Sequence, residues 1–245
     1  MTLLRLPANH AKSHRAVTDS ARPSLVRRSF SEGLAAFALV FIGCGAIVTA
    51  SEFPHGLSSV GVAAAFGLVI MTMIYATGHL SGAHINPAVT VAFTATRHFP
   101  IRDASAYVAA QLTGAAIAGF ALLAVWPDKP ADLGTTAPSI GIGGAFVYEL
   151  LLTAFLMFVI MAVATDTRAV GAAAAIAIGG TVAMDALMGG PVTGASMNPA
   201  RSFGPALASG QWHDFWLYVL APITGAIVGA IAYQAVRGDS VPEAG

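Results

Sequence analysis

One short sequence occurs twice, once in each half of the chain. Residues 81–88 read SGAHINPA and residues 193–200 read TGASMNPA, 112 positions further on. Later in each half, YVAAQLTGAAIAG from Tyr107 matches YVLAPITGAIVGA from Tyr218 at a spacing of 111. The chain is therefore predicted to contain two copies of one structural unit, and its fold must accommodate both.

Six stretches are long and apolar enough to cross a bilayer, which takes about 20 mostly apolar residues in a helix. They lie near residues 30–51, 58–78, 103–124, 143–164, 170–189 and 214–236. None alternates apolar and polar residues with a period of two, so a lipid-facing barrel is excluded. Only 10% of the chain is charged, against roughly 25% in soluble domains. We predict an all-α integral membrane protein.

The duplication and the spans together define the domain organisation. With three spans in each half, the second copy enters the membrane from the opposite side, which is an inverted-topology repeat. We place the first repeat at 30–125 and the second at 143–237. Residues 1–29 are polar and basic and lack the apolar core of a secretory signal, so we predict a disordered cytoplasmic tail.

The basic residues predict the orientation. If the tail lies inside, ten of the twelve Lys and Arg residues face the cytoplasm. Lys129 is then left in an outer loop and Arg201 within the membrane. This asymmetry follows the positive-inside rule, so we expect a multi-pass protein of the cell membrane with both termini in the cytoplasm.

Each Asn-Pro-Ala predicts the start of a helix, because Asn favours the N-cap and Pro favours the first helical position. The two motifs are listed as Asn86, Pro87, Ala88 and Asn198, Pro199, Ala200. The apolar segment after each is about 17 Å long, roughly half of a 30 Å hydrocarbon core. We therefore expect two half-helices that enter from opposite faces and meet near the midplane.

GHLSGAHINPAVT and TGASMNPARSFGPA resemble the paired signature loops of the major intrinsic proteins, the aquaporins and glycerol facilitators. The resemblance runs from about Ser31 to Arg237. ATDTRAVG and GGPVTGASMNPARS are most similar to the nodulin-26-like branch, and the short loops to bacterial members. The family resemblance implies a bundle of six transmembrane helices plus two half-helices, assembled in the lipid bilayer as a homotetramer with one pore in each subunit.

The same resemblance implies roles for the signature loops. Asn86 and Asn198 would direct their side-chain amides into the pore. Backbone carbonyls would supply acceptors along the path, from Gly82, Ala83, His84, Gly194, Ala195, Ser196 and Met197. Glu32 and Glu149 stand at like places in the two halves; buried and unpaired, each would cost several kcal/mol. We expect both carboxylates to accept N–H groups from the loops as scaffold.

The resemblance also implies which residues form the narrowest ring of the pore: Phe66, Ala186, Ala195 and Arg201. Water-selective members usually carry His where this chain has Ala186, which predicts a ring wide enough for larger solutes. Ser202, by contrast, stands where glycerol facilitators usually carry Asp, and nodulin-26-like proteins usually have Trp in place of Phe66. We expect passive flow of water with glycerol-like polyols and neutral metalloid hydroxides such as arsenous or boric acid, excluding protons and ions.

Two other functions remain open: a water-selective aquaporin, and an ion-coupled secondary transporter, which also uses inverted repeats. The sequence has no nucleophile paired with a base, no metal-ligand cluster and no nucleotide-binding loop. We therefore expect no enzyme activity, metal, cofactor or nucleic-acid partner.

Four ionisable side chains are secondary candidates. Asp185, beside Ala186, is expected to make a helix–helix hydrogen bond or to lie at the outer mouth. His79, His84 and His98 are expected near the cytoplasmic mouth, and titration of any of the four is a hypothesis for gating.

Overall fold

The structure, a computed structural model, describes residues 23–166 and 173–238, and in this part of the chain it is helical with no strand. Six helices are long and apolar enough to cross a membrane: α1 (Leu25–Glu52), α2 (Ser59–Ser81), α4 (Ile101–Val125), α5 (Ile142–Thr165), α6 (Ala174–Thr193) and α8 (Leu217–Val236). Two shorter helices, α3 (Pro87–Ala95) and α7 (Pro199–Ser209), and a short turn, η1 (Pro130–Gly134), complete the fold.

The first helix begins earlier than the sequence suggested. Ser24 caps α1 by accepting the backbone N–H of Arg27 at 3.4 Å, and Arg28 pairs with Asp103 of α4 at 2.9 Å. The assignment of residues 25–29 to a disordered tail was therefore wrong. The cap and the buried ion pair extend the helix below its apolar stretch. Residues 1–22, and 167–172 in the ATDTRAVG loop, lie outside the described residues.

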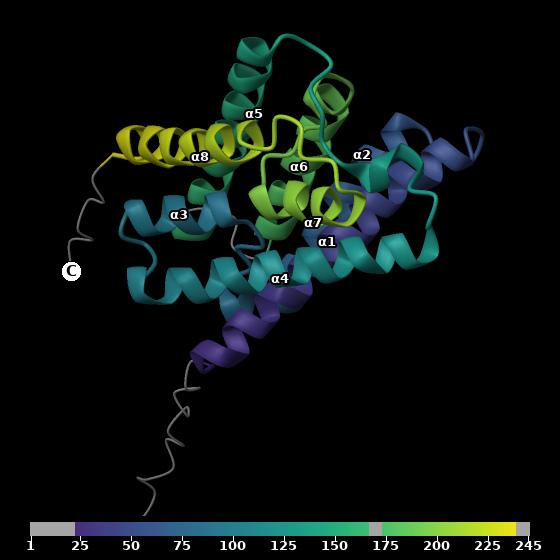
Figure 1. Cartoon of the computed structure of the whole chain (residues 1–245). Helices are drawn as coiled ribbons and strands as arrows, with labels where there is room; N and C mark the ends of the chain where they lie inside the picture. The colour runs from purple at the N-terminus through teal and green to yellow at the C-terminus, as the bar shows by residue number, and fades with distance from the viewer. Residues whose placement is uncertain (1–22, 167–172, 239–245) are drawn as a thin grey trace, which may run out of the picture.

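The half-helices α3 and α7 lie end to end in the middle of the molecule, between the long helices (Figure 1). Asn86 and Asn198 occupy their N-caps, and Pro87 and Pro199 their first helical positions, as expected for Asn-Pro-Ala. Each side-chain oxygen accepts the N–H of the following Ala, at 2.8 Å for Asn86 and 3.0 Å for Asn198. The two helix starts therefore point toward each other.

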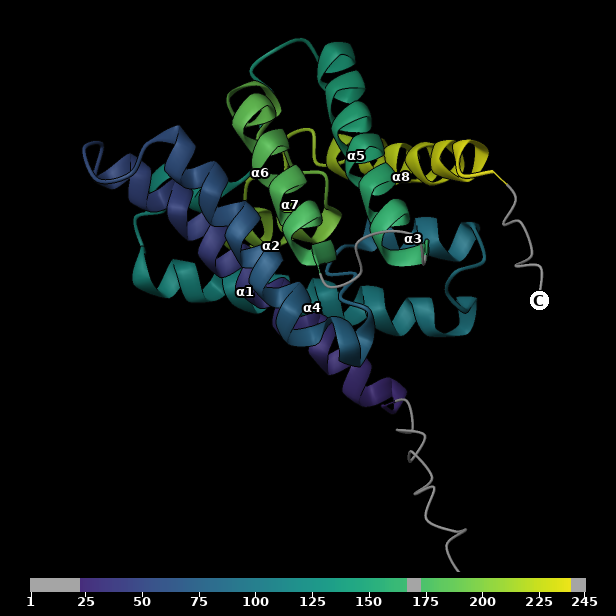
Figure 2. The same cartoon turned by 180° about the vertical axis from the view of Figure 1, so that it is seen from behind.

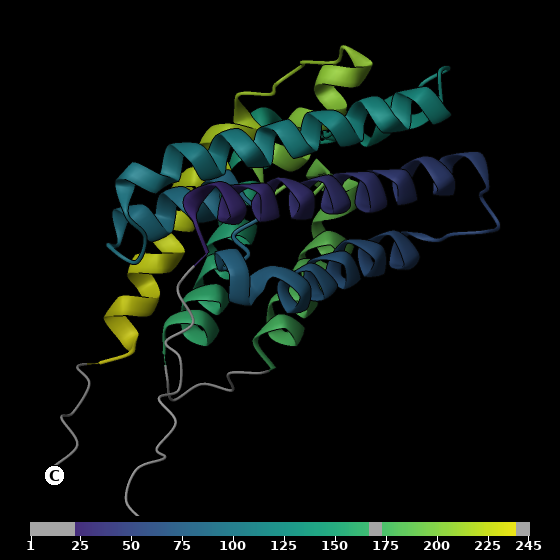
Figure 3. The same ribbon diagram turned by 90° about the horizontal axis from the view of Figure 1, so that it is seen from below.

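The long helices pack in matching sets. Helix α1 lies between α4 and α2 (Figure 3), and α5 packs on α8 and α6. Helices α2 and α6 join the halves, and Figure 2 views this side. Small residues allow close approach: a side chain on Gly114 of α4 would collide with the carbonyl of Gly33, and one on Gly225 of α8 with that of Leu150. The packing of α1 on α4 thus repeats in α5 on α8.

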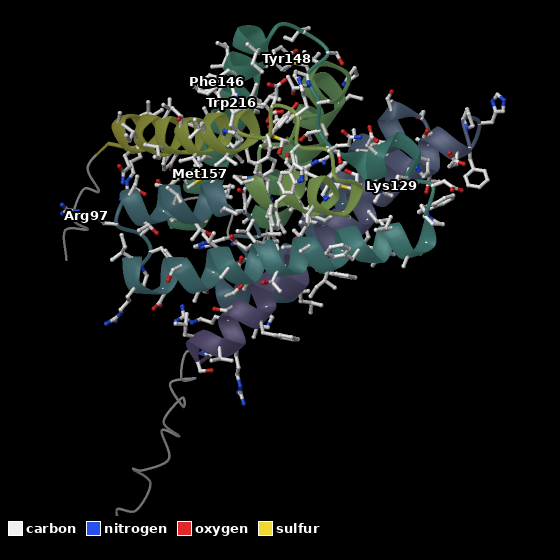
Figure 4. The ribbon with its side chains drawn as sticks, in the orientation of Figure 1. Arg97, Lys129, Phe146, Tyr148, Met157 and Trp216 are labelled. Carbon is white, nitrogen blue, oxygen red and sulfur yellow. The ribbon has the colours of Figure 1, made fainter. Side chains whose placement is uncertain are left out.

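The two ends of the bundle differ in charge. At the end we call the tail end, where α1 begins, Arg28 meets Asp103, and where α8 finishes Tyr233 donates to Asp166 at 2.8 Å. The opposite end, the far end, carries Lys129, and Figure 4 shows Lys129 and Arg97 on opposite sides of the molecule. The described basic residues of the tail end are Arg27, Arg28, Arg97, Arg102 and Arg237.

Candidate pore

The loop before each half-helix takes a backbone path that L-residues rarely adopt. In the first loop φ is 92° at Gly82, 47° at Ala83 and 57° at Ile85. The second loop, residues 194–197, repeats this with 87°, 41° and 52° at the first, second and fourth positions. Non-Gly residues in this region are held there only by surrounding contacts, so other groups must fix both loops.

Glu32 fixes the first loop from behind. Its side chain is fully buried, and its two oxygens accept the N–H of His84 at 2.9 Å and that of Ile85 at 2.6 Å. The Ser81 hydroxyl donates to it at 2.7 Å and the Gln111 amide at 2.9 Å. These are the scaffold hydrogen bonds expected from the sequence.

Glu149 holds the second loop in the same way. Its oxygens accept the N–H groups of Ser196 and Met197, both at 2.9 Å, and the Thr193 hydroxyl at 2.7 Å. A tyrosine hydroxyl then ties the start of each loop to its neighbouring helix: Tyr218 donates to the carbonyl of Thr193 at 2.7 Å, and Tyr107 to that of Ser81 at 2.7 Å. Both buried carboxylates are therefore structural groups with several donors each.

The two asparagines are joined crosswise. The Asn86 amide donates to the carbonyl of Met197 at 2.8 Å, and the Asn198 amide donates to the carbonyl of Ile85 at 3.0 Å. Each amide has two N–H groups, so one remains available to a solute. Ile85 was missed in the sequence, although the 112-residue offset from Met197 identifies it.

A cavity of ≈ 120 Å³ passes both asparagines. A single water needs about 10–15 Å³ by this kind of measure, so the cavity has room for several waters. One wall consists of loop backbone and the other is aliphatic, formed by Leu39, Ile70, Ile74, Leu156, Ile160 and Val182. The cavity is a narrow passage with polar groups along one side.

Six of the seven loop residues predicted to supply pore carbonyls line this cavity: Gly82, Ala83, His84, Ala195, Ser196 and Met197. The seventh, Gly194, does not line it. Its α-carbon faces Thr136 so closely that a side chain there would meet the threonine methyl. This contact concerns the α-carbon, so the role predicted for the Gly194 carbonyl stays a prediction.

All four residues predicted for the narrow ring, Phe66, Ala186, Ala195 and Arg201, line the same cavity. The guanidinium carbon of Arg201 lies 5.0 Å from the Phe66 ring centroid, a cation–π distance. Its Nη1 donates to the carbonyl of Gly134 at 2.7 Å, and its Nε has no hydrogen-bond partner among the described residues. The ring thus combines one donor-rich cation with an aromatic wall and two methyl groups.

The carbonyl that holds Arg201 was not identified from the sequence. It belongs to Gly134, at the end of η1, a turn with φ between 47° and 57° at Ala131, Asp132 and Leu133. Lys129 secures the turn by donating to the carbonyl of Ser209, the last residue of α7, at 2.9 Å. Nothing in the local pattern of this loop predicts which carbonyl it presents to the pore.

Ser202 links the second loop to the far-end segment. Its hydroxyl lies 2.6 Å from that of Ser196 and accepts from Thr136 at 2.9 Å. The position that distinguishes this chain from glycerol facilitators therefore supports the loop from behind, and Ser202 does not line the passage.

At the tail end a wider cavity of ≈ 440 Å³ adjoins the passage and shares Gly82 and His84 with it. His79, His84 and His98 all line it. His84 Nδ1 lies 3.1 Å from the Thr90 hydroxyl, and its ring contacts three aromatic rings. The three histidines thus meet at the tail-end mouth, where His84 is held in place.

Asp185 does not line the passage. It is 5% exposed and faces a groove between α5 and α6, alongside Tyr148 and Phe155; Figure 4 labels Tyr148. Its Oδ2 has no hydrogen-bond partner among the described residues, so that oxygen does not make the predicted helix–helix hydrogen bond. No group of three metal-binding side chains occurs in the described part of the chain.

The comparisons with known proteins agree with this geometry. The family profile described as Major intrinsic protein matches residues 19–233. Nodulin-26 of Glycine max is 44% identical over 217 residues, 89% of this chain and 80% of that protein. Aquaporin NIP2-1 of Oryza sativa subsp. japonica is 44% identical over 232 residues, 94% of this chain and 77% of its own length.

A solved structure also matches. The aquaglyceroporin from Plasmodium falciparum superposes with a TM-score of 0.77 at 28% sequence identity, covering 87% of this chain and 97% of that one. The family profile, over residues 19–233, includes both half-helices and reaches from before α1 into α8.

Proposed function

The chain belongs to the major intrinsic protein family, and from that premise we propose that its pore conducts polyols such as glycerol and neutral metalloid hydroxides together with water. Proteins of this family are passive channels, so the protein is a membrane channel for water and small neutral solutes and not an enzyme. The observation that carries the proposal is the ring at Arg201, where Ala186 and Ala195 present only methyl groups to the passage.

The ring suits a polyol because its two sides differ. Arg201 lines the passage and its guanidinium offers N–H donors to hydroxyl groups. Phe66 and the two alanines face the carbon backbone of the solute. A boric or arsenous acid molecule, neutral and rich in hydroxyls, presents the same combination of groups.

The midpoint explains why protons and cations would be excluded. The N-termini of α3 and α7 each carry about half a positive charge and point at the same region. Asn86 and Asn198 offer donors there, so a passing water is held by its oxygen and the hydrogen-bonded chain that a proton needs is interrupted.

The lining argues against an ion-coupled transporter. Such a protein binds its coupling cation at the crossing through acidic side chains or the C-terminal ends of half-helices, whereas α3 and α7 meet there by their N-termini. The described residues that line the passage include no Asp or Glu, since Glu32 and Glu149 are occupied behind the loops.

The test is stopped-flow light scattering of proteoliposomes with water, glycerol and arsenous acid. Ala186→His should lower glycerol flux at least tenfold while water flux persists, because the imidazole narrows the ring. Leu187→His is the matched control: it adds the same side chain one position along α6, where residue 187 is 49% exposed on the outer surface. It should leave all three fluxes unchanged.

If the wild type passes only water, the pore is water-selective and the proposal for polyols and metalloids is wrong. If both histidine variants slow glycerol equally, the effect belongs to the helix and not to the ring.

We also propose a homotetramer in the cell membrane with both termini in the cytoplasm. The homotetramer rests on the family alone. The orientation is supported by the excess of arginine at the tail end, where five of the described arginines lie, together with the positive-inside rule. The mass of the detergent-solubilised protein and labelling of single cysteines placed at each end would test the two parts separately.

A further inference from the structure

We infer that the groove between α1 and α4 binds one anionic phospholipid, with an acyl chain in the groove and the phosphate held between Arg27 and Arg102. The groove has a volume of ≈ 450 Å³ and opens on the outer surface of the bundle, away from the pore. Its walls are apolar: Phe30, Leu34 and Phe37 on α1, and Ala110, Thr113 and Ile117 on α4.

Two glycines make the floor of the groove. Gly33 and Gly114 bring the backbones of α1 and α4 together, and neither leaves room for a side chain without displacing the other helix. The rims stand clear of this floor, since Phe30 is 73% and Ile117 is 56% exposed. A hydrocarbon chain laid along the floor would be flanked by apolar side chains over several helical turns.

An arginine stands at the tail-end limit of each wall. Arg27 precedes Phe30 by three residues and Leu34 by seven, so it shares their face of α1. Arg102 precedes Thr113 by eleven residues, three helical turns, and shares its face of α4. Both arginines are exposed, and neither has an ion-pair partner among the described residues.

The neighbouring residues join the two helix ends that carry these cations. Arg28 and Asp103, next to them in sequence, form the 2.9 Å ion pair that joins the first turns of α1 and α4. Asp103 is therefore occupied by Arg28, which leaves Arg27 and Arg102 free for a phosphate. Guanidinium groups bind phosphate oxygens with two parallel N–H bonds.

A hydroxyl marks the level of the headgroup. Ser29 lines the groove between Arg27 and Phe30, and its Oγ is buried with no hydrogen-bond partner in the described part of the chain. A buried hydroxyl without a partner is destabilising. Rotation of the Ser29 side chain toward the groove would let a lipid phosphate or ester oxygen at this level accept its proton.

The second repeat provides an internal comparison. At the offsets that align the two copies, the counterparts of Arg27, Ser29, Gly33 and Arg102 are Gly144, Phe146, Leu150 and His213. Phe146 stacks with Trp216 at 6.3 Å, and Figure 4 shows the two side by side. The second copy thus has larger side chains where the first has its groove and no arginine at its end, so the site belongs to the first repeat alone.

The experiment is native mass spectrometry of the purified full-length protein titrated with phosphatidylglycerol or phosphatidylcholine of the same chain length. Phosphatidylglycerol should bind more tightly to the wild type. Arg27→Gln with Arg102→Gln should weaken it about 25-fold, about fivefold for each arginine, the effect of about 1 kcal/mol per cation near an anionic headgroup.

Two controls separate a site from general charge or packing. Arg97→Gln removes one cation at the tail end, where Arg97 lies beyond α3 in Figure 4, and should leave lipid binding unchanged. Thr113→Phe should fill the groove and weaken both lipids, whereas Ile231→Phe, on the exposed face of α8, should not. Water flux and the melting temperature should stay at wild-type values in all four variants.

Four results would overturn the inference. Equal binding of the two lipids would remove the role of the phosphate. Equal losses in Arg97→Gln and in the double variant would indicate general surface charge. Displacement of the lipid by millimolar inorganic phosphate would identify a free-anion site. A change of oligomeric mass in Thr113→Phe with lipid binding intact would show that a second copy of the chain covers the groove.

Discussion

The two loops that meet at the centre of the channel have nearly the same backbone but different polar surroundings. Each loop is held by a glutamate and a tyrosine, and a backbone carbonyl of each accepts a hydrogen bond from the asparagine that follows the other loop. Behind the first loop Gln111 donates to Glu32 at 2.9 Å and to Thr90 at 3.1 Å. The counterpart of Gln111 in the second repeat is Pro222, which has no side-chain donor.

The surroundings of the second loop differ in a second way. The counterpart of Val89, which follows the first Asn-Pro-Ala, is Arg201, the cation of the narrow ring. The pair His84 and Thr90 of the first loop becomes the pair Ser196 and Ser202, which reaches out to Thr136. The repeat therefore fixes the geometry of the midpoint, and the departures from symmetry place the cation of the narrow ring in the second half.

The largest expected effect comes from removing the two carboxylates. Glu149→Ala leaves two backbone N–H groups and one hydroxyl without a partner, at about 1–3 kcal/mol for each buried group. Glu32→Ala should cost about 1 kcal/mol less, because the buried Gln111 Oε1, which has no partner in the described chain, can turn toward a freed N–H. Thermal unfolding in detergent measures both.

Gln111→Leu is the control for this difference. When Gln111→Leu is combined with Glu32→Ala, the compensation by Gln111 is lost, and the loss of stability should become as large as in Glu149→Ala. A Glu32→Ala variant less stable than Glu149→Ala would contradict the compensation by Gln111.

The next effect tests the cation of the second half. Arg201→Val gives the second loop the residue of the first and should raise the leak of protons and small cations at least tenfold, because about one full positive charge is lost from the ring. A pH-sensitive dye inside proteoliposomes records the leak. Val89→Ala, at the mirrored position, should leave it unchanged; an unchanged leak in Arg201→Val would assign the whole barrier to the half-helix ends.

The smallest effect compares the two hydroxyls. Ser202→Ala removes the hydrogen bonds to Ser196 and Thr136 and should lower stability by about 1–2 kcal/mol while shifting the ratio of glycerol to water flux. Thr90→Ala should cost a similar amount and leave that ratio unchanged, because its partners Gln111 and His84 lie on the other side of the midpoint. Equal shifts in the flux ratio for both variants would mean that selectivity depends on both loops alike and not on the second loop in particular.

Much of this arrangement follows from sequence. The apolar lengths define the spans, and the doubled Asn-Pro-Ala defines the half-helices and the crossing. The offset of 112 that relates Asn86 to Asn198 also relates Ile85 to Met197. It was sufficient to identify both carbonyl acceptors, although only Met197 was named.

Other features depend on tertiary contacts that no local pattern encodes. The acceptor for Arg201 is Gly134, which reaches the pore only because η1 turns through three left-handed residues. The start of α1 depends on an ion pair between residues 75 positions apart, and the α-carbon of Gly194 packs against Thr136 of the far-end segment. In each case the local sequence allows more than one arrangement, and contacts with residues distant in the chain decide between them.

The crossed asparagine amides also govern how the channel is made. The acceptor for Asn86 is synthesised 111 residues later, and Asn198 must find a carbonyl 113 residues earlier. During biogenesis the first three spans therefore enter the membrane with an unfinished polar centre, which only the arrival of the second half completes. A chain cut in the loop between α4 and α5 should consequently yield two fragments that are inactive alone and form a working channel when both are inserted into one bilayer.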